Sequence, residues 1–220
     1  VSGLNVADGS GVTKSVTGTF TVDISTNGAN GLDTGAEAAN THYAIWAIWK
    51  SGSALAGVAS LSFSNPGVPA TYTHKALLTS VRNNASSILL AQTQFEDEVA
   101  LGPVNDTTTQ VLSSGTATTP TLVDCSAFCP PTARAVKLSV TTNGSASGVD
   151  INALLYDAVT GNVVVTCGYK DDSGAANYNV SNVWVPLNTN REVKYSVNNG
   201  TNVATTIRIS GYRMAPKLQL

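Results

Sequence analysis

Apolar and polar residues alternate with a period of two along much of the chain. In the segment Val16–Val22, the positions Val16, Gly18, Phe20 and Val22 alternate with threonines. Successive side chains of a β-strand point to opposite faces of its sheet, so this pattern predicts a strand with one buried face and one wet face. The chain is therefore expected to enter its fold as a half-buried strand.

The segment Tyr43–Trp49 is apolar at every position, which predicts a central strand that is buried on both faces. A hairpin turn is expected at Lys50–Ser53, with an alternating return strand at Ala59–Ser64. Two more strands are expected at Thr73–Val81 and Ile88–Phe95. The first half thus reads as a series of short strands.

Short segments of strand character, several of them alternating, continue through the second half and are separated by Gly and Asn turn signals. They cover Val136–Val140, Ile151–Tyr156, Val163–Cys167, Val193–Val197 and Ile207–Ile209. Val159–Asn162 predicts a hairpin turn, and Glu37–Ala39 is the segment where one helical turn is expected. The predicted fold class is all-β with almost no helix: an antiparallel β-sandwich, jelly-roll-like, built from one or two β units.

The middle of the chain carries no such pattern. Residues 107–120 are small and polar and lack periodicity, which is typical of a linker or a long crossing segment. The simplest partition has an N-terminal β-sandwich unit at 1–106 and a C-terminal β-sandwich unit at 121–220. The alternative is a single sandwich that uses strands from both halves, since a long crossing segment permits it.

Composition narrows the class of protein. The 220 residues include 12 Lys and Arg and 14 Asp and Glu, with a net charge of −2 and 12 % charged residues. Nucleic-acid binders normally carry a basic surface, so no nucleic-acid partner is expected. The longest apolar run, Tyr43–Trp49, is far shorter than a membrane span, so no membrane insertion is expected. Val1–Gly11 lacks the features of a signal peptide, so we expect a non-secretory route or a leader already removed.

Cysteine and histidine are the residues that most often carry metal or nucleophile chemistry. The three cysteines, Cys125, Cys129 and Cys167, are expected to be small buried hydrophobic residues. One disulfide or a metal site is the alternative, although an odd number of cysteines is poor support for a disulfide framework. His42 and His74 have no neighbouring carboxylate in the sequence, so no catalytic role is expected for them. No cofactor is predicted.

The triplet Asp33-Thr34-Gly35 is the signature of aspartic proteases. Those enzymes need two aspartates that share a proton, whereas Asp33 alone carries the triplet here and follows a loop rather than an apolar strand. We therefore expect Asp33, Thr34 and Gly35 to form a structural turn through side-chain to backbone hydrogen bonds. Proteolysis through Asp33 is kept as a remote alternative.

Aromatic and acidic residues offer two further candidate sites. Trp46 and Trp49 lie in an apolar run and, three residues apart on a strand, should face opposite sides of the sheet. Trp184 lies outside that run and is the candidate for contact with a glycan. Gln94–Glu98 is the densest acidic run, but it lacks the spacing of a calcium loop and is read as a solvated strand end.

Two stretches resemble a module of tailed-bacteriophage virion proteins, found in tail-fibre, head-fibre and receptor-binding chains. They are Asn30–Tyr43, which contains Gly-Leu-Asp-Thr-Gly and leads into the apolar strand, and Tyr72–Arg82, with its Tyr-Thr-x-Lys-x-x-Leu-x-x-Val-Arg pattern. The end of the chain, Ile207–Arg213, is similar to the closing strand of such proteins. His42 stands where the family usually has tryptophan, and Thr79 where glycine is frequent.

The resemblance covers about residues 28–84, with a fainter match over 121–213. It implies a non-enzymatic virion structural protein: a tail fibre, a head fibre or a capsid decoration subunit. The expected partners are copies of itself, as a homotrimer, other virion proteins, and a host cell-surface glycan as receptor. Its expected location is the virion, assembled in the host cytoplasm. The alternative is a carbohydrate-binding module on a bacterial or phage surface.

Overall fold

The computed structural model describes residues 3–102, 109–144, 150–170, 176–199 and 202–215. Within them the chain is almost entirely β-structure and has no α-helix, which confirms the predicted all-β, antiparallel fold class. The described part likewise contains no helix long and apolar enough to cross a membrane. The chain divides into two compact units, with the boundary between Leu90 and Ala91.

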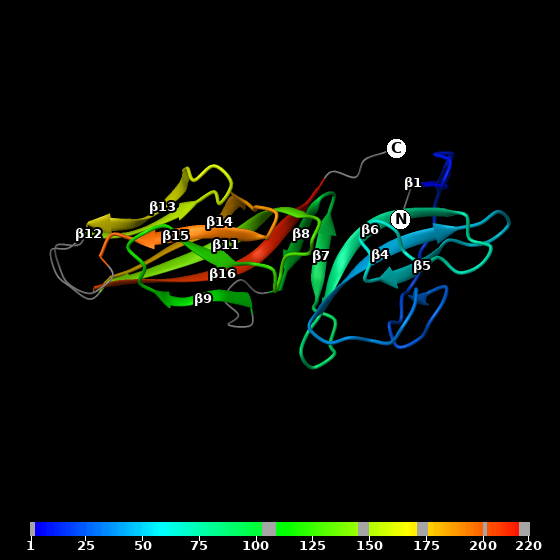
Figure 1. The fold of residues 1–220 in the computed structure, drawn as a ribbon, viewed down its shortest axis with the longest axis horizontal. Coiled ribbons are helices and arrows are strands. Elements are labelled where there is room, and N and C mark those ends of the chain that lie inside the picture. Colours follow the sequence, from blue (N-terminus) through cyan, green and yellow to red (C-terminus); the bar gives the residue numbers. More distant parts are fainter. Residues whose placement is uncertain (1–2, 103–108, 145–149, 171–175, 200–201, 216–220) are drawn as a thin grey trace. The chain divides into compact units, whose positions relative to one another are not determined.

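The first unit is built on one six-stranded sheet. Its strands are β1 (Leu4–Ala7), β2 (Thr13–Val16), β3 (Gly31–Leu32), β4 (Thr41–Trp49), β5 (Ala56–Ser60) and β6 (His74–Asn83). Their order across the sheet is β2-β1-β6-β4-β5-β3, and every pair is antiparallel except β3 with β5. Figure 1 shows β4 between β6 and β5, so the fully apolar segment occupies the middle of the sheet.

Both faces of β4 are buried, as its sequence predicted. On one face Trp46 packs with Ile48 and Val58, and loop residues such as Phe63 cover them. The opposite face of the strand packs in two clusters, one of which includes Trp49. Trp46 and Trp49 therefore lie on opposite sides of the sheet, and each belongs to the core of the unit.

The prediction of a strand at Val16–Val22 is wrong. Strand β2 ends at Val16, and residues 17–23 make no ladder. Phe20 and Val22 nonetheless pack inward, and a Cβ added to Gly57 of β5 would overlap the Phe20 ring and lie 2.6 Å from a Val22 methyl group. The segment therefore lies across the face of the sheet. Its alternation reflects one buried side, which does not require a hydrogen-bonded neighbour.

Other boundaries in this unit also moved. The turn at Lys50–Ser53 is present, with Gly52 at φ 74°, but the return strand is β5 rather than Ala59–Ser64. Glu37–Ala39 forms no helical turn. Its backbone is instead held by polar contacts: the Asn83 amide donates to the Ala38 carbonyl, and the Tyr43 hydroxyl accepts from the Ala38 N–H.

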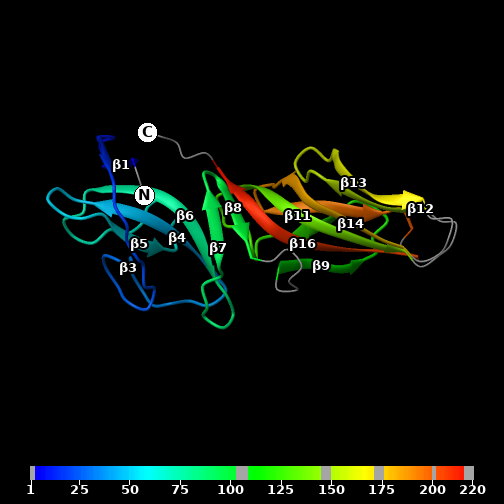
Figure 2. The same ribbon diagram turned by 180° about the vertical axis from the view of Figure 1, so that it is seen from behind.

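The second unit is a sandwich of two antiparallel sheets. Its strands are β7 (Gln92–Phe95), β8 (Glu98–Leu101), β9 (Gln110–Gly115), β10 (Thr121–Asp124), β11 (Ala133–Gly144), β12 (Asp150–Tyr156), β13 (Val163–Lys170), β14 (Ala176–Pro186), β15 (Glu192–Val197) and β16 (Val203–Met214). One sheet has the order β10-β15-β12-β13. The other has the order β14-β11-β16-β8-β7, and β9 also pairs with β16. Figure 2 shows β11, β14 and β16 running side by side.

Apolar side chains from both sheets fill this sandwich. Leu138 and Ile207 from the larger sheet are fully buried, as are Leu155 and Val193 from the smaller one. In β11, buried residues alternate with less buried ones, so one face of the larger sheet is turned to the core and the other away from it.

The predicted boundary between the two units, at residues 107–120, is also wrong. Strands β7 and β8, which were assigned to the first unit, belong to the second because β8 pairs with β16. Within the expected linker, Gln110–Gly115 forms β9 and also pairs with β16. Those strands are adjacent only in three dimensions, so the polar pattern of the segment did not reveal the pairing. The two-unit organisation stands, with its boundary earlier in the chain than expected.

Candidate functional site

The Asp33-Thr34-Gly35 triplet forms a hydrogen-bonded loop after β3. The Asp33 carboxylate accepts a hydrogen bond from the Ser60 hydroxyl and another, at 3.0 Å, from the Gly67 N–H. The Asp33 N–H donates to the Ala59 carbonyl at 2.8 Å. These contacts tie the loop to the end of β5 and to the segment that follows it, so the carboxylate acts as a structural acceptor.

The other two residues of the triplet have different surroundings. Thr34 is exposed. Gly35 adopts φ 82°, a conformation that favours glycine, and its carbonyl accepts a hydrogen bond from the Asn27 side-chain amide at 3.0 Å. The triplet thus occupies a turn in which glycine is required by the backbone.

The three cysteines are free and buried. Burial raises the pKa of the Cys125 thiol to about 12 and raises that of Cys129 well above its ordinary value. Thiols of this kind stay protonated at neutral pH and are poor nucleophiles. Cys125 and Cys129 close one tight turn, in which the Cys129 N–H donates to the Cys125 carbonyl at 2.9 Å.

Metal-binding geometry is absent from the part of the chain that the structure describes: no three His, Cys, Asp or Glu side chains come together there. His74 bonds to Thr73 through Nδ1 at 2.8 Å and packs edge-on against Trp49, with ring centroids 5.2 Å apart. His42 lies in β4, paired with Arg82 of β6. Both histidines therefore belong to the first unit, whereas all three cysteines belong to the second.

Trp184 lies on the larger sheet of the second unit and is partly buried. Two cations contact its ring: the Arg213 guanidinium lies 4.4 Å from the ring centroid, and the Lys137 ammonium lies 5.4 Å from it. Trp184 on β14 is directly opposite Lys137 on β11, and Arg213 comes from β16. The indole ring therefore makes cation–π contacts with two side chains. Its contact with a glycan stays a prediction.

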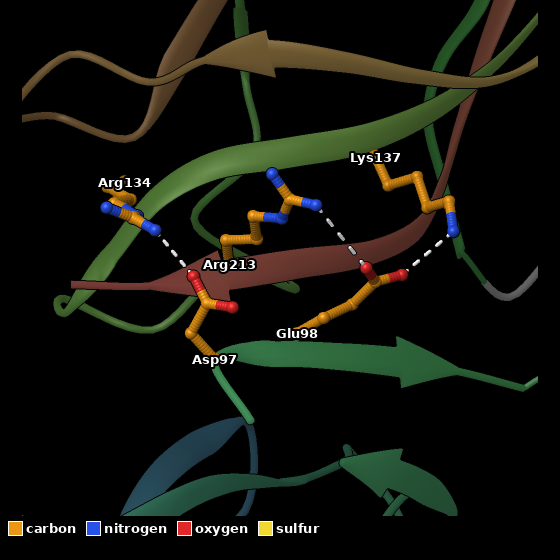
Figure 3. Close-up of polar contacts among 5 residues, drawn as sticks. All are labelled: Asp97, Glu98, Arg134, Lys137 and Arg213. Atoms are coloured by element: carbon orange, nitrogen blue, oxygen red, sulfur yellow. Dashed lines mark hydrogen bonds and ion pairs between the residues drawn. The ribbon is translucent and has the colours of Figure 1, made fainter. Parts of the chain in front are cut away.

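Acidic side chains complete this cluster, as Figure 3 shows. Glu98 of β8 accepts a hydrogen bond from the Lys137 ammonium at 2.8 Å and lies 3.7 Å from the Arg213 guanidinium. Asp97, just before β8, pairs with Arg134. We call Glu98, Lys137, Trp184 and Arg213 the Trp184 cluster. It joins four strands and fastens the β7–β8 hairpin to the rest of the sheet.

The acidic run Gln94–Glu98 therefore covers the end of β7, the turn at residues 96–97 and the first residue of β8, and both Asp97 and Glu98 are paired to cations. Phe95, inside the same run, is 76 % exposed. No local sequence pattern connects Phe95 with Trp184, because they lie on strands far apart in the chain. In the structure the register from β7 through β8, β16 and β11 to β14, together with the alternation of side chains along each strand, places both residues on the same face of the sheet.

Comparisons with protein-family models, with curated proteins and with solved structures find no match to this chain.

Proposed function

We propose that this chain is a structural protein of a tailed-phage virion: a tail fibre, a head fibre or a capsid decoration subunit. It acts without catalysis, as an oligomer that attaches to the particle and to a host receptor. The observation that carries the proposal is the way the phage-like pattern folds. Its two stretches, Asn30–Tyr43 and Tyr72–Arg82, meet in the first unit, where β4 and β6 pair from Thr41 with Asn83 to Trp49 with His74.

The residues of that pattern have framework roles. Leu32 and Tyr43 are buried in one core cluster, and the Asp33 carboxylate bonds across to Ser60 and Gly67. A pattern whose members hold one fold together is what a shared structural module requires. An enzyme of the aspartic-protease type would instead need this carboxylate turned toward a second one.

Composition and fold favour an attachment role. The chain is poor in charge, at 12 %, and its strands carry many Thr, Ser and Asn side chains. Such a surface suits contact with copies of itself, because closed symmetric homo-oligomers are the common case for soluble assemblies. We propose a trimer, in which several weak contacts to a receptor act together through avidity.

Three measurements test this proposal. Protein mass spectrometry of purified phage particles should find the chain at a copy number that fits a symmetric assembly, and gold-labelled antibodies should place it on the tail or the head. Native mass spectrometry of the isolated chain at micromolar concentration should give a trimer. Absence of the chain from purified particles would contradict the virion role, and a lone monomer would contradict the oligomeric mechanism.

A carbohydrate-binding module is the second candidate. It is favoured by one observation: an exposed aromatic ring, Phe95, lies on the same sheet as the cation-bearing Trp184 cluster. Under this alternative the glycan contact is the main role of the chain, whereas in the virion proposal it serves attachment to the host.

A further inference from the structure

The outer face of the larger sheet in the second unit carries a row of cross-strand neighbours. Phe95 of β7 is opposite Glu98 of β8, and Glu98 is opposite Arg213 of β16. Val99 and Tyr212, the residues next to Glu98 and Arg213 in the sequence, are fully buried. Since side chains alternate along a strand, Phe95, Glu98 and Arg213 point away from the core.

The charges on and beside this face do not cancel. Among the residues that the structure describes, four cations, Arg134, Lys137, Arg208 and Arg213, accompany three anions, Glu96, Asp97 and Glu98, which leaves an excess of one positive charge in a chain whose net charge is −2. Arg134 neutralises Asp97, and Lys137 holds Glu98 at 2.8 Å. Glu98 is shared by Lys137 and Arg213, and Arg208 forms no ion pair with another described residue, so the face favours a negatively charged ligand.

Arg213 is positioned to receive an anion. Its guanidinium lies over the Trp184 ring, 4.4 Å from the ring centroid, which restricts its movement, and its side chain is 42 % exposed. Its contact with Glu98, at 3.7 Å, is too long for a hydrogen bond, so this carboxylate does not occupy the exposed N–H groups of the guanidinium. A fixed guanidinium with unused N–H donors is the group that binds carboxylates in two-pronged geometry.

Phe95 adds an apolar contact at the other end of the row. It is two strands from Arg213, which corresponds to about 10 Å at the usual spacing of strands. The ring is 76 % exposed and points to the same side as the guanidinium. That distance suits an extended ligand with an acidic group and a stackable ring, rather than a single small ion.

We propose that this face binds an acidic oligosaccharide, with a sugar carboxylate on Arg213 and the apolar face of a sugar ring on Phe95. The inference rests on the proposed function in one respect, because it names the receptor class for an attachment protein. It differs from the expectation for Trp184: the indole orients Arg213 and does not itself stack on the sugar. A neutral glycan would leave the excess positive charge unused, and an inorganic anion would leave Phe95 unused.

Binding of three matched probes to the full chain tests the proposal. They are oligogalacturonate, which has a carboxylate on each ring, its methyl ester, which keeps the rings without the charge, and inorganic polyphosphate. Calorimetry is run on the wild type, Arg213→Gln, Phe95→Ala and the control Lys14→Gln, which removes one exposed cation from β2 of the other unit. Thermal unfolding and native mass spectrometry of each variant check its fold and its oligomeric state.

We expect oligogalacturonate to bind far more tightly than its methyl ester. Arg213→Gln should weaken that binding about tenfold and Phe95→Ala several-fold, since a charged contact exceeds a single ring contact. Lys14→Gln should leave it unchanged. Absence of oligogalacturonate binding would overturn the proposal, as would equal binding of polyphosphate with no effect of Phe95→Ala.

Loss of the oligomer in Arg213→Gln would also overturn the proposal, because the face would then be an interface between copies. The outcomes separate the two proposals. Chains found in particles that bind no acidic saccharide refute this inference alone. Chains that bind the saccharide through Arg213 and Phe95 but are absent from particles refute the virion role alone.

Discussion

Substitution of Asp33 by alanine distinguishes a structural role of its carboxylate from a catalytic one. The change removes the acceptor of two hydrogen bonds, one from the Ser60 hydroxyl and one from the Gly67 N–H. If Asp33 only holds the loop, stability falls and no activity is lost. If Asp33 is catalytic, acid-dependent cleavage disappears while stability changes little.

The magnitude follows from how buried each donor is. The Ser60 side chain belongs to a residue that is 1 % exposed, so its hydroxyl is left without an acceptor, at a cost of about 1–3 kcal/mol. The Gly67 N–H lies at an exposed site where water replaces the carboxylate, which limits that loss to about 1 kcal/mol. We expect Asp33→Ala to reduce the free energy of unfolding by about 2–4 kcal/mol. Asp33→Asn keeps one acceptor oxygen and should cost about half as much.

Urea unfolding followed by tryptophan fluorescence measures this loss. Trp46 and Trp49 both lie in the first unit, so a Trp184→Phe background makes the signal report that unit alone. With a slope of about 2 kcal/mol per molar urea, the midpoint should fall by about 1–2 M. A double-mutant cycle with Ser60→Ala should give a coupling energy of about 1 kcal/mol or more, because the two side chains share one hydrogen bond.

The result that refutes the structural reading is a midpoint within error of the wild type and no coupling to Ser60. Loss of a pepstatin-sensitive cleavage at acid pH in the same variant would revive the protease alternative. The control is a variant of the neighbouring exposed residue, Thr34→Ala. It should leave the urea midpoint unchanged and show no coupling energy with Ser60→Ala.

Three further outcomes follow from the structure. Gly57→Ala should destabilise the first unit by about 1–3 kcal/mol because its Cβ would overlap the Phe20 ring, whereas Gly9→Ala, which meets nothing within 4 Å, should be neutral; urea midpoints compare the two. The pKa of Cys125 is about 12 in the folded state against an ordinary 9.0, so its contribution to stability is complete below pH 9 and is lost as the pH rises toward 12. Between pH 9 and 12 the urea midpoint of the wild type should therefore fall more steeply than that of Cys125→Ala. The same thiol should react with a disulfide reagent only as the chain unfolds, and rapid reaction of the native protein would contradict its burial.

The period-two pattern predicted strands well where both the alternation and the pairing are regular. The central position of Tyr43–Trp49 followed from its apolar character on both faces, β11 followed from clean alternation, and β12 followed from the hairpin signal at Val159–Asn162. Val16–Val22 failed because the same alternation serves a segment that lies on a sheet without joining it. The pattern reports burial of one side and says nothing about a hydrogen-bonded neighbour.

Strand β14 was missed for a different reason. Its pairing with β11 shifts register between Leu138 and Val140, where Asn182 adopts φ 64°, so the alternation is broken by a bulge. The Trp184 cluster was only half predictable on the same grounds. Trp184 was singled out as an aromatic residue outside the apolar run, but Lys137 and Arg213 reach it through sheet order, which no local pattern contains.

The geometry of the proposed saccharide face makes one last prediction, about chain length. A single guanidinium and a single ring on an open sheet face give weak binding at one site, since such a surface encloses little of its ligand. In a trimer, a polymer that spans several faces gains effective concentration and should bind about 10²–10⁴ times more tightly than a short oligomer of the same sugar. Surface-immobilised polygalacturonate and free short oligomers give the two affinities for one preparation. Equal affinities per site would mean that the faces act singly, which would contradict multivalent attachment while leaving the role of Arg213 intact.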